Sequence, residues 1–465
     1  MRPLCVDLDG TLVKSDTLAE CVVAMLHRNP ARLALLPLWL SRGRAYLKER
    51  AAGAAGLNVA ALPYNPAIVM LLEREKSAGR KIVLATGASR KVAQRVADHL
   101  GLFDEVLASD AQMNLTGESK ARLLVERFGA KGFDYIGDSR ADIRVWREAA
   151  EAIPANRGAR KYAGGAIPPV SDSDTSLFPA LLRLLRVHQW TKNLLIFVPI
   201  AAAHNWRDAA GLWHTALGFA ALCLCASAGY ISNDLADLEA DRAHPFKRRR
   251  PLAAGDFPLV LAACLLPLLA VAGFGFGLAA GPRFAVSLLV YLAVTTAYSA
   301  RLKRVAILDV LTLAGLYVVR IVGGGLTAGV VLSPWLIAFS MFLFLSIALA
   351  KRCAELRNAE DAQDFESRRR GYSPADFDQL ARFGTSSAYL SALVLALYIH
   401  AAETGVLYKR PLWLWGLVPL MIYWTNRVWL EVSRGKMHED PVLFALRDKA
   451  SWVTVFAAAI VLLLA

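Results

Sequence analysis

The chain has 465 residues, of which 56% are hydrophobic and 20% are charged, and its formal net charge at pH 7 is +14. This length allows two or more domains, and the apolar excess indicates a membrane protein with an additional water-soluble part. The basic balance fits the positive-inside rule, and no segment has the pattern of a nucleic-acid-binding module. The six cysteines are scattered, without the spacing of a zinc site or a disulfide framework.

The first 165 residues or so alternate short apolar runs, such as PLCVDL and KIVLAT, with helix-like segments. This pattern predicts an α/β, Rossmann-like domain whose parallel sheet carries helices on both faces and binds ligands at the carboxyl ends of its strands. The N-terminus has no apolar signal segment, so we expect this domain in the cytosol. We expect domain limits at 1–165 and 183–465, joined by a linker over 166–182.

Polar groups suited to phosphate chemistry follow the predicted strands. The motif CVDLDGTLV places Asp7 and Asp9 after the first strand, where one carboxylate can attack phosphorus and the other can act as acid and base. Three later motifs, LATGAS, GESKARLL and YIGDSRADI, supply side chains that can bind phosphate or a hard metal ion: Thr86, Lys120, Asp138 and Asp142.

These four motifs, in this order, resemble those of the haloacid dehalogenase superfamily over residues 1–150. The resemblance implies a phosphatase in which Asp7 is the nucleophile that becomes an aspartyl-phosphate, while Asp9 is the general acid and base. It also implies that Thr86 and Lys120 hold the phosphoryl group. The implied Mg²⁺ site draws on four carboxylates: Asp7, Asp9, Asp138 and Asp142. A catalytically dead or regulatory domain is the alternative.

An insertion over about residues 15–72 separates the first two motifs. In the superfamily that the motifs resemble, this position holds a helical cap that sets substrate choice. Here it contains LALLPLWLSRGRAYLKER, in which an apolar run around Trp39 precedes several basic residues. A buried cap helix explains the pattern, but a patch that contacts anionic lipid would let the site reach a lipid-borne phosphate.

The chain from about residue 187 onward is mostly apolar and predicts an all-α, polytopic membrane domain. We expect nine spans, near 192–206, 211–232, 257–280, 284–299, 308–327, 334–350, 383–401, 411–430 and 451–465. Lys and Arg gather in alternate loops, which places the N-terminus inside and the C-terminus outside. We therefore expect a multi-pass protein of the bacterial cytoplasmic membrane with its active sites on the cytosolic side.

The segment NDLADLEADRAHPFKRRRPLAAG follows the second of these spans. On a helix, three of its acids fall within about 60° of one another, with Asn233 at the edge of their face: Asp234, Asp237 and Asp241. Carboxylates at a membrane boundary are costly unless they are paired or bind a metal, so this face predicts a catalytic Mg²⁺–diphosphate site. Lys247 and Arg250 could neutralise a leaving diphosphate, although ordinary positive-inside charge also explains the basic run.

The patterns NDxxDxxxD and PxKxRRP resemble the first signature of the UbiA superfamily of intramembrane prenyltransferases. The second signature belongs after the fourth span, where Tyr298, Lys303 and Asp309 match it. A typical member repeats the acid as DxxxD, but Leu313 occupies the second acidic position here. This departure weakens the case for a prenyl-diphosphate site built from two Asp clusters.

Three further stretches, RVHQWTKNLLIFVPI, LSIALAKRCAELRNAE and EDPVLFALRDKAS, point to one branch of that superfamily. Together with the single acid they resemble decaprenyl-phosphate phosphoribosyltransferases over about residues 183–465. The resemblance implies phosphoribosyl pyrophosphate as donor and a polyprenyl phosphate as acceptor. Further substrate-binding candidates near span ends are Lys192, Lys303, Asp309, Arg320 and Lys351. Snorkelling of the cations and an interfacial role for Tyr298 are the alternatives.

We therefore expect a bifunctional enzyme. The membrane half would attach 5-phosphoribose to the lipid, and the phosphatase would remove the 5-phosphate to give a pentose donor for cell-surface polysaccharide. A UbiA-type enzyme that prenylates an aromatic or polycyclic acceptor beside a separate phosphatase is the first alternative. A transporter with a regulatory phosphatase-like domain is the second, but its ionisable residues would lie near the bilayer midplane. The sequence leaves the oligomeric state open, a homo-oligomer included.

Overall fold

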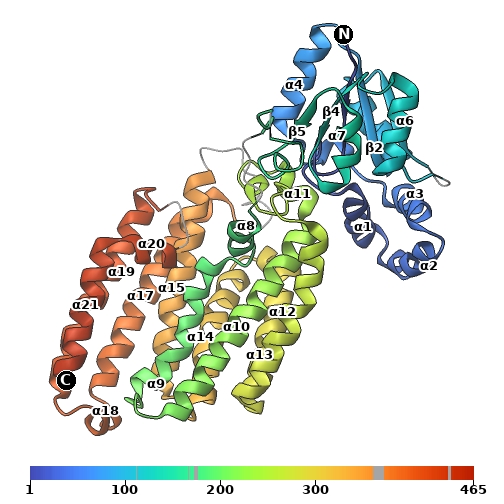
Figure 1. Cartoon of the computed structure of the whole chain (residues 1–465). Helices are drawn as coiled ribbons and strands as arrows, with labels where there is room; N and C mark the ends of the chain where they lie inside the picture. Colours follow the sequence, from blue (N-terminus) through green and yellow to red (C-terminus); the bar gives the residue numbers. More distant parts are fainter. Residues whose placement is uncertain (111–112, 166, 172–175, 360–370, 438–440) are drawn as a thin grey trace. The chain divides into compact units, whose positions relative to one another are not determined.

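The computed structural model of the chain (Figure 1) describes all residues except 111–112, 166, 172–175, 360–370 and 438–440. The chain forms two compact units of packing. Unit 1 consists of Met1–Arg186 with Ser227–Leu268, and unit 2 consists of Val187–Ala226 with Leu269–Ala465. Unit 1 therefore includes the Asp-rich segment, and the domain limits expected at residues 165 and 183 stay predictions.

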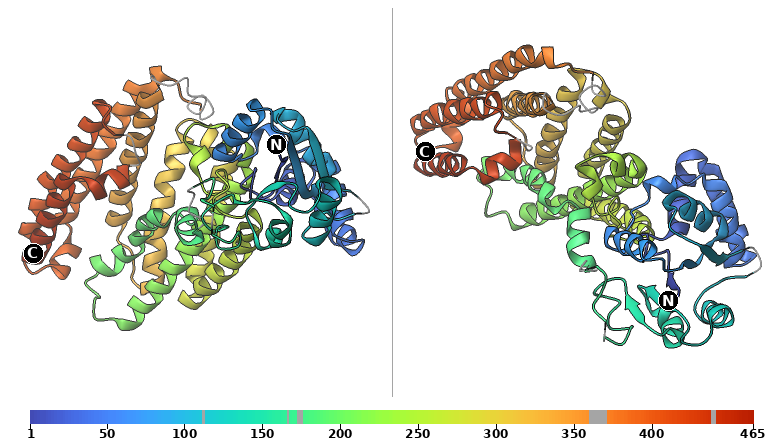
Figure 2. Two further views of the ribbon diagram at one scale, coloured as in Figure 1. Left: turned by 45° about the horizontal axis from the view of Figure 1, so that its top comes forward. Right: turned by 90° about the horizontal axis from the view of Figure 1, so that it is seen from above.

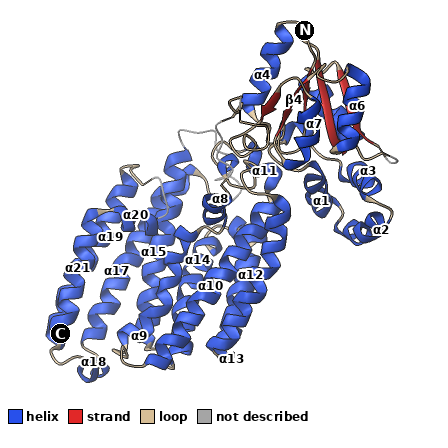
Figure 3. Ribbon diagram, in the orientation of Figure 1, coloured by secondary structure: helices blue, strands red, loops and turns tan. Residues whose placement is uncertain are grey.

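A parallel sheet of five strands in the order β3-β2-β1-β4-β5 forms the centre of unit 1, as the strand–helix alternation predicted (Figure 3). The strands are β1 (Leu4–Val6), β2 (Ile82–Ser89), β3 (Glu105–Ser109), β4 (Asp134–Gly137) and β5 (Ala152–Pro154). In the register of the central strands, Leu4 lies opposite Ile82 on one side and Asp134 on the other.

Helices cover both faces of this sheet because successive strand residues point to opposite sides. The covering helices are α1 (Thr17–Arg28), α4 (Pro66–Ser77), α5 (Arg90–Leu100), α6 (Glu118–Phe128) and α7 (Ile143–Glu148). Leu4 and Val6 of β1 belong to one core with α1, α4 and α5. Cys5, between them, belongs to the opposite core with α6 and α7. The sheet thus has two packed layers of helices, which leaves its carboxyl edge for the site.

The predicted cap consists of α1 with four short elements: η1 (Pro30–Leu35), α2 (Leu36–Ser41), α3 (Arg44–Ala55) and η2 (Val59–Ala61). No residue of η1 or α2 is buried, although Leu36 and Trp39 pack partly against the core. Leu38 and Leu40 expose about half of their surface, at 54% and 52%. A buried cap helix therefore does not describe α2, and contact with anionic lipid stays a prediction.

The remaining short elements of unit 1 follow β4, begin in the expected linker or belong to the Asp-rich segment. They are η3 (Arg140–Asp142), α8 (Leu177–Leu184), α11 (Leu238–Ala243) and η5 (Lys247–Arg249). Helix α8 begins inside the expected linker and ends shortly before unit 2 begins.

Unit 2 is built from helices that pack side by side in the succession α13–α14–α15–α17–α19–α21 (Figures 1 and 2). Helices α10 and α12 contribute residues to both units. The elements are η4 (Val187–Phe197), α9 (Val198–Ala202), α10 (Ala209–Ala236), α12 (Leu259–Ala280), α13 (Pro282–Ala300), η6 (Leu302–Arg304), α14 (Leu308–Ala328), α15 (Pro334–Ala359), η7 (Pro374–Asp376), α17 (Phe377–Ile399), α18 (Ala402–Leu407), η8 (Pro411–Gly416), α19 (Leu417–Ser433), α20 (Pro441–Arg447) and α21 (Lys449–Leu464).

Within the described ranges, six helices are long and apolar enough to cross a membrane. They are Ala209–Ala236, Leu259–Ala280, Pro282–Ala300, Leu308–Ala328, Pro334–Arg357 and Pro374–Ile399. The span expected at 192–206 is instead a 3₁₀ helix followed by the five-residue α9, and α19 and α21 have only 17 and 16 residues. The prediction of a multi-pass membrane protein is confirmed, but the count of nine spans is not.

Candidate active sites

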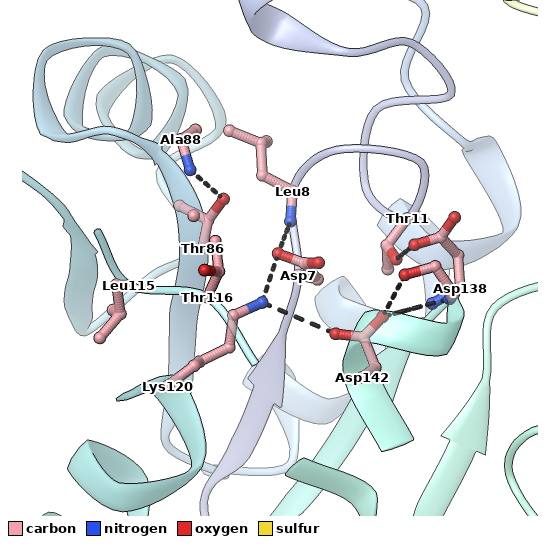
Figure 4. Close-up of polar contacts among 12 residues, drawn as sticks. Asp7, Leu8, Thr11, Thr86, Ala88, Leu115, Thr116, Lys120, Asp138 and Asp142 are labelled. Carbon is pink, nitrogen blue, oxygen red and sulfur yellow. Dashed lines mark hydrogen bonds and ion pairs between the residues drawn. The ribbon is translucent and has the colours of Figure 1, made fainter. Parts of the chain in front are cut away.

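The phosphatase motifs meet at the carboxyl edge of the sheet (Figure 4). Asp7 directly follows β1, Asp138 directly follows β4, and Lys120 lies in the first turn of α6. The Lys120 ammonium nitrogen lies 3.0 Å from Asp7 Oδ1, which also accepts a hydrogen bond from the Leu8 backbone N–H at 2.9 Å. Three segments far apart in the sequence thus contribute to one site, as parallel strand order requires.

Three carboxylates converge in this site. Oxygen atoms of Asp7, Asp138 and Asp142 lie within 4.8 Å of one another. Asp142 is already held, because Oδ1 accepts from the Tyr135 hydroxyl at 2.9 Å and Oδ2 accepts from the backbone N–H groups of Asp138 and Ser139 at 3.2 Å. Asp7 and Asp138 are therefore the better placed direct ligands, and Asp142 supports them.

Lys120 is the cation of the site and is 96% buried. Its ammonium group donates to the Tyr135 hydroxyl at 2.8 Å and lies 3.7 Å from Asp142 Oδ1. Tyr135 therefore connects the lysine to the carboxylate, a role that the motif search missed. The alternation of side chains along β4 could have indicated this role, because it places Tyr135 on the face of the sheet that α6 and α7 cover.

Burial raises the pKa of two of the acids that face the site, Asp7 and Asp138. Desolvation raises the pKa of Asp7, against the opposing charge of Lys120. It also raises the pKa of Asp138 to about 8, with Asp7 adding to the effect. Converging oxygen ligands with excess negative charge suit a hard divalent cation, so these residues fit Mg²⁺.

Asp9 lies apart from this group of carboxylates. Its Oδ1 accepts from the Thr17 N–H at 2.8 Å, and burial together with Asp16 raises the pKa of Asp9 to about 7. A pKa near neutrality suits a general acid and base. Its part in metal binding stays a prediction, because its side chain is not among the converging ligands of the described residues.

The second motif and the cap meet beside Asp9. Thr86 is buried within β2, and its hydroxyl accepts from the Ala88 N–H at 3.0 Å. Lys48 of α3 donates to the Gly87 carbonyl at 2.6 Å and lines a small cavity with Asp9, Thr17 and neighbouring residues. Lys48 is thus a cation near the phosphoryl site that the sequence showed only as part of the cap's basic run.

Gly10 is required by the close approach of two loops. Its φ of +76° is unfavourable for other residues, and a Cβ there would lie 2.3 Å from Asp138 Oδ2. The glycine of the first motif therefore leaves room for a predicted metal ligand.

The Asp-rich segment is not one continuous helix. Helix α10 ends at Ala236, and Asp237 begins the separate helix α11. Arg250 lies between two of the acids, 3.1 Å from Asp234 Oδ1 and 2.7 Å from Asp241 Oδ2. Asp237 is exposed. The shared face predicted from helical spacing therefore brings Asp234 and Asp241 together around an arginine but leaves Asp237 outside.

Arg186 completes this acid–arginine network and was missed from the sequence. It lies 2.5 Å from Asp234 Oδ1 and covers the Tyr230 ring at 4.6 Å from the ring centroid. The signal was the basic residue that opens the RVHQW stretch. Among the residues that the structure describes, these acids are not part of a converging group of carboxylates, so the Mg²⁺ site expected here stays a prediction. Asn233 and Lys247, from the same segment, are half-buried.

Asp309 is fully buried in a clamp of its own in unit 2. Arg352 donates to both of its oxygens, Nε to Oδ2 at 2.5 Å and Nη2 to Oδ1 at 2.9 Å. Tyr298 donates to Oδ1 at 2.8 Å, and Arg352 also pairs with Glu355. The clamp joins α13, α14 and α15 and occupies both oxygens, so Asp309 does not fit a metal ligand. Sequence reasoning selected Lys351 and missed the neighbouring Arg352.

Arg320 lies in the interior of α14, not near a span end as expected, and is 92% buried. Its guanidinium donates to Asn193 Oδ1 at 2.9 Å, the Leu316 carbonyl at 2.7 Å and the Tyr291 hydroxyl at 3.0 Å. No carboxylate of the described chain pairs with it. The other predicted cations of unit 2, Lys192, Lys303 and Lys351, are each half-buried.

Two protein-family models match separate parts of this chain. The model of the UbiA prenyltransferase family matches residues 194–463, and the model of haloacid dehalogenase-like hydrolase matches residues 4–147. The chain is 41% identical over 461 residues to the Sinorhizobium fredii protein named "Uncharacterized protein y4nM", covering 97% of this chain and 88% of the relative.

It is also 38% identical over 198 residues to the decaprenyl-phosphate phosphoribosyltransferase of Mycolicibacterium smegmatis, which covers 41% of this chain and 62% of that enzyme. Among solved structures, a UbiA homolog from Archaeoglobus fulgidus bound to GPP and Mg²⁺ has 18% identity and a TM-score of 0.46, covering 61% of this chain and 99% of that one. The chain therefore belongs to the UbiA prenyltransferase family and carries a haloacid dehalogenase-like hydrolase domain at its N-terminus.

Proposed function

We propose that the chain transfers 5-phosphoribose from phosphoribosyl pyrophosphate to a polyprenyl phosphate, and that its N-terminal domain then removes the 5-phosphate. The main support for the transfer step is the 38% identity to a decaprenyl-phosphate phosphoribosyltransferase. That match covers about three fifths of the relative, so its activity comes to this chain as a proposal. The absent second acid at Leu313 and the clamp on Asp309 support it over ordinary prenyl transfer.

In the transfer step, a phosphate oxygen of the lipid attacks ribose C1 and pyrophosphate leaves. Asp234 and Asp241 hold Arg250, whose guanidinium suits recognition of a diphosphate. The Mg²⁺ predicted for Asp234, Asp237 and Asp241 stays a prediction. The further groups proposed for the two anionic substrates are Lys192, Asn233, Lys247, Tyr298, Lys303, Asp309, Arg320 and Lys351.

In the phosphatase step, an Asp7 oxygen attacks the 5-phosphate and forms an aspartyl-phosphate, while Asp9 gives its proton to the departing ribose oxygen. Asp9 then takes a proton from the water that hydrolyses the aspartyl-phosphate. Lys120 and Thr86 hold the phosphoryl oxygens. Mg²⁺ bound by Asp7 and Asp138, with Asp142 in support, would neutralise negative charge on the transferred group. The product is polyprenyl-phosphoryl-ribose, made on the cytosolic side for cell-surface polysaccharide.

The first experiment incubates purified protein with Mg²⁺, labelled phosphoribosyl pyrophosphate and a polyprenyl phosphate, and then extracts the lipid. We expect label in the lipid phase, and we expect Asp237→Asn to abolish it. No label in the lipid, together with consumption of a prenyl diphosphate and an aromatic acceptor, would establish the prenyltransferase alternative.

The second experiment assigns the phosphatase domain. With Asp7→Asn, we expect the labelled lipid to keep its 5-phosphate, because the nucleophile is lost while the transferase is intact. Continued release of phosphate from the lipid product by this variant would refute the assignment.

A further inference from the structure

We propose that the ion pair between Glu20 and Arg242 couples the two activities. It would hold the Asp-rich segment of the transferase on the first helix of the phosphatase domain, so that the 5-phosphorylated lipid is dephosphorylated by the chain that made it. This inference rests on the proposed function. It concerns residues of unit 1 alone, since that unit contains both partners.

The two partners are 222 residues apart in the sequence and are joined by two hydrogen bonds. Arg242 Nη1 donates to Glu20 Oε2 at 3.0 Å, and Nη2 donates to Oε1 at 2.6 Å. The two side chains expose only 9% and 2% of their surface. A paired arrangement of this kind fixes orientation as well as distance, and breaking it leaves a buried charge without a partner.

The surrounding loop is shaped for this contact at several points. Arg242 Nε also donates to the Ala253 carbonyl at 3.1 Å, which orients the guanidinium. At the rim, the Asn58 side-chain amide donates to Glu239 Oε1 at 2.6 Å. Gly255 has a φ of +73°, and a Cβ there would lie 2.7 Å from the Lys14 Cβ. The Asp-rich segment therefore contacts the phosphatase domain at α1, beside η2 and at the first motif's loop.

The contact reaches both predicted sites. Glu20 lies one turn after Thr17 on α1, and the Thr17 N–H holds the Asp9 carboxylate. On the other side, Arg242 directly follows Asp241, which holds Arg250. Attachment of this kind raises the effective concentration of one site near the product of the other, without any new contact to that product.

The contact can be tested without any activity measurement. In the full chain, we expect Glu20→Gln to speed hydrogen exchange of the amides in α11 and residues 251–256 by about tenfold or more, because the guanidinium loses its buried partner. Glu105→Gln is the matched control, since it removes a glutamate paired with Lys81 and Arg127 elsewhere in unit 1. Unchanged exchange in Glu20→Gln would overturn the proposal.

The coupling is tested with labelled phosphoribosyl pyrophosphate and a polyprenyl phosphate. At early times, we expect Glu20→Gln to raise the fraction of lipid product that keeps its 5-phosphate by about fivefold or more, as a lost effective concentration requires. Hydrolysis of a small water-soluble phosphomonoester should stay within about twofold of the unmodified protein. Arg242→Lys keeps the positive charge, so the fraction of 5-phosphorylated lipid that it leaves should lie between the values for Glu20→Gln and for the unmodified protein.

Two results would contradict the coupling. If the soluble phosphomonoester is hydrolysed more slowly by the same factor as the lipid product, Glu20 only supports α1. If the lipid product is dephosphorylated at the unmodified rate, the ion pair does not couple the steps. Should no phosphoribosyl lipid form in any variant, the proposed function fails and the coupling with it, whereas the exchange measurement still reports on the contact.

Discussion

The phosphatase and transferase parts of this chain place their acidic residues in opposite surroundings. In the phosphatase site, Asp7, Asp138 and Asp142 face one another, with the ammonium of Lys120 as the cation between them. In the transferase part, the buried acids face arginines instead, with Asp234 and Asp241 on Arg250 and Asp309 on Arg352. Converging carboxylates carry an excess of negative charge that a metal ion can balance, whereas acids paired with arginines are already neutralised.

The largest expected effect comes from removing the proposed nucleophile, Asp7. We expect Asp7→Asn to lower hydrolysis of a soluble phosphomonoester by about 10⁴-fold or more, because the amide that replaces the attacking carboxylate is a poor nucleophile. Asp98→Asn, which changes an exposed aspartate on α5, is the control and should hydrolyse the substrate normally. Substantial residual turnover in Asp7→Asn would mean that the converging acids serve another purpose.

The next largest effect is a loss of stability when an acid loses its paired arginine. Removing the clamp with Arg352→Ala should cost about 3–5 kcal/mol in free energy of unfolding, because Asp309 is left buried and unpaired. Arg427→Ala, which breaks the more exposed pair with Asp448, should cost about 1 kcal/mol or less. Thermal unfolding of the full chain in one detergent compares the two, and equal losses would contradict the difference in burial.

A smaller effect tests how closely the phosphatase acids are packed. Gly10→Ala should reduce phosphomonoester hydrolysis by about 10- to 100-fold, because the new methyl group displaces Asp138 and the backbone at Gly10 is strained. Gly101→Ala is a matched control, since that glycine also has a positive φ but has no neighbour within 4 Å. Its activity should be unchanged, and an equal loss in both variants would assign the effect to strain alone.

The smallest effect concerns pH. Hydrogen bonds from Arg427 and Ser451 lower the pKa of Asp448 to about 2, with the arginine as the larger cause. A lowered pKa contributes stability above pH 4, and this contribution is lost as the pH falls from about 4 toward 2. We expect Asp448→Asn to lower the unfolding temperature at pH 6 by an amount equivalent to about 1 kcal/mol or less, and by less at pH 3. A gap that widens at pH 3 would contradict this sign.

Much of the phosphatase site could be predicted because short motifs at strand ends determine it. Asp7, Lys120 and Asp138 are brought together by strand order alone, which alternation in the sequence already indicates. Tyr135 was missed because its role depends on which face of β4 meets α6. Motifs of this kind identify the reacting groups but not the side chains that orient them.

The transferase part was harder to predict because helical spacing assumes an unbroken helix. The break at Asp237 removes that residue from the face it would share with Asp234 and Asp241. Arg186 and Arg352 come from other segments, and no spacing rule within the Asp-rich segment or the second signature could identify them as partners. The apolar pattern likewise indicated a membrane domain but overstated its long spans, since length alone did not reveal the 3₁₀ stretch at Val187–Phe197.

The buried Arg320 has a consequence for how the protein is made. An arginine at the centre of a single membrane helix costs about 2.5–3.5 kcal/mol during insertion by the translocon. In the finished protein its guanidinium is satisfied by Asn193 and Tyr291, which precede it in the chain. Those partners are synthesised before α14, so the earlier segments can receive this helix as it leaves the ribosome. We therefore expect α14 to insert into the bilayer while it packs against η4 and α13, so that its insertion depends on helix assembly as well as on hydropathy.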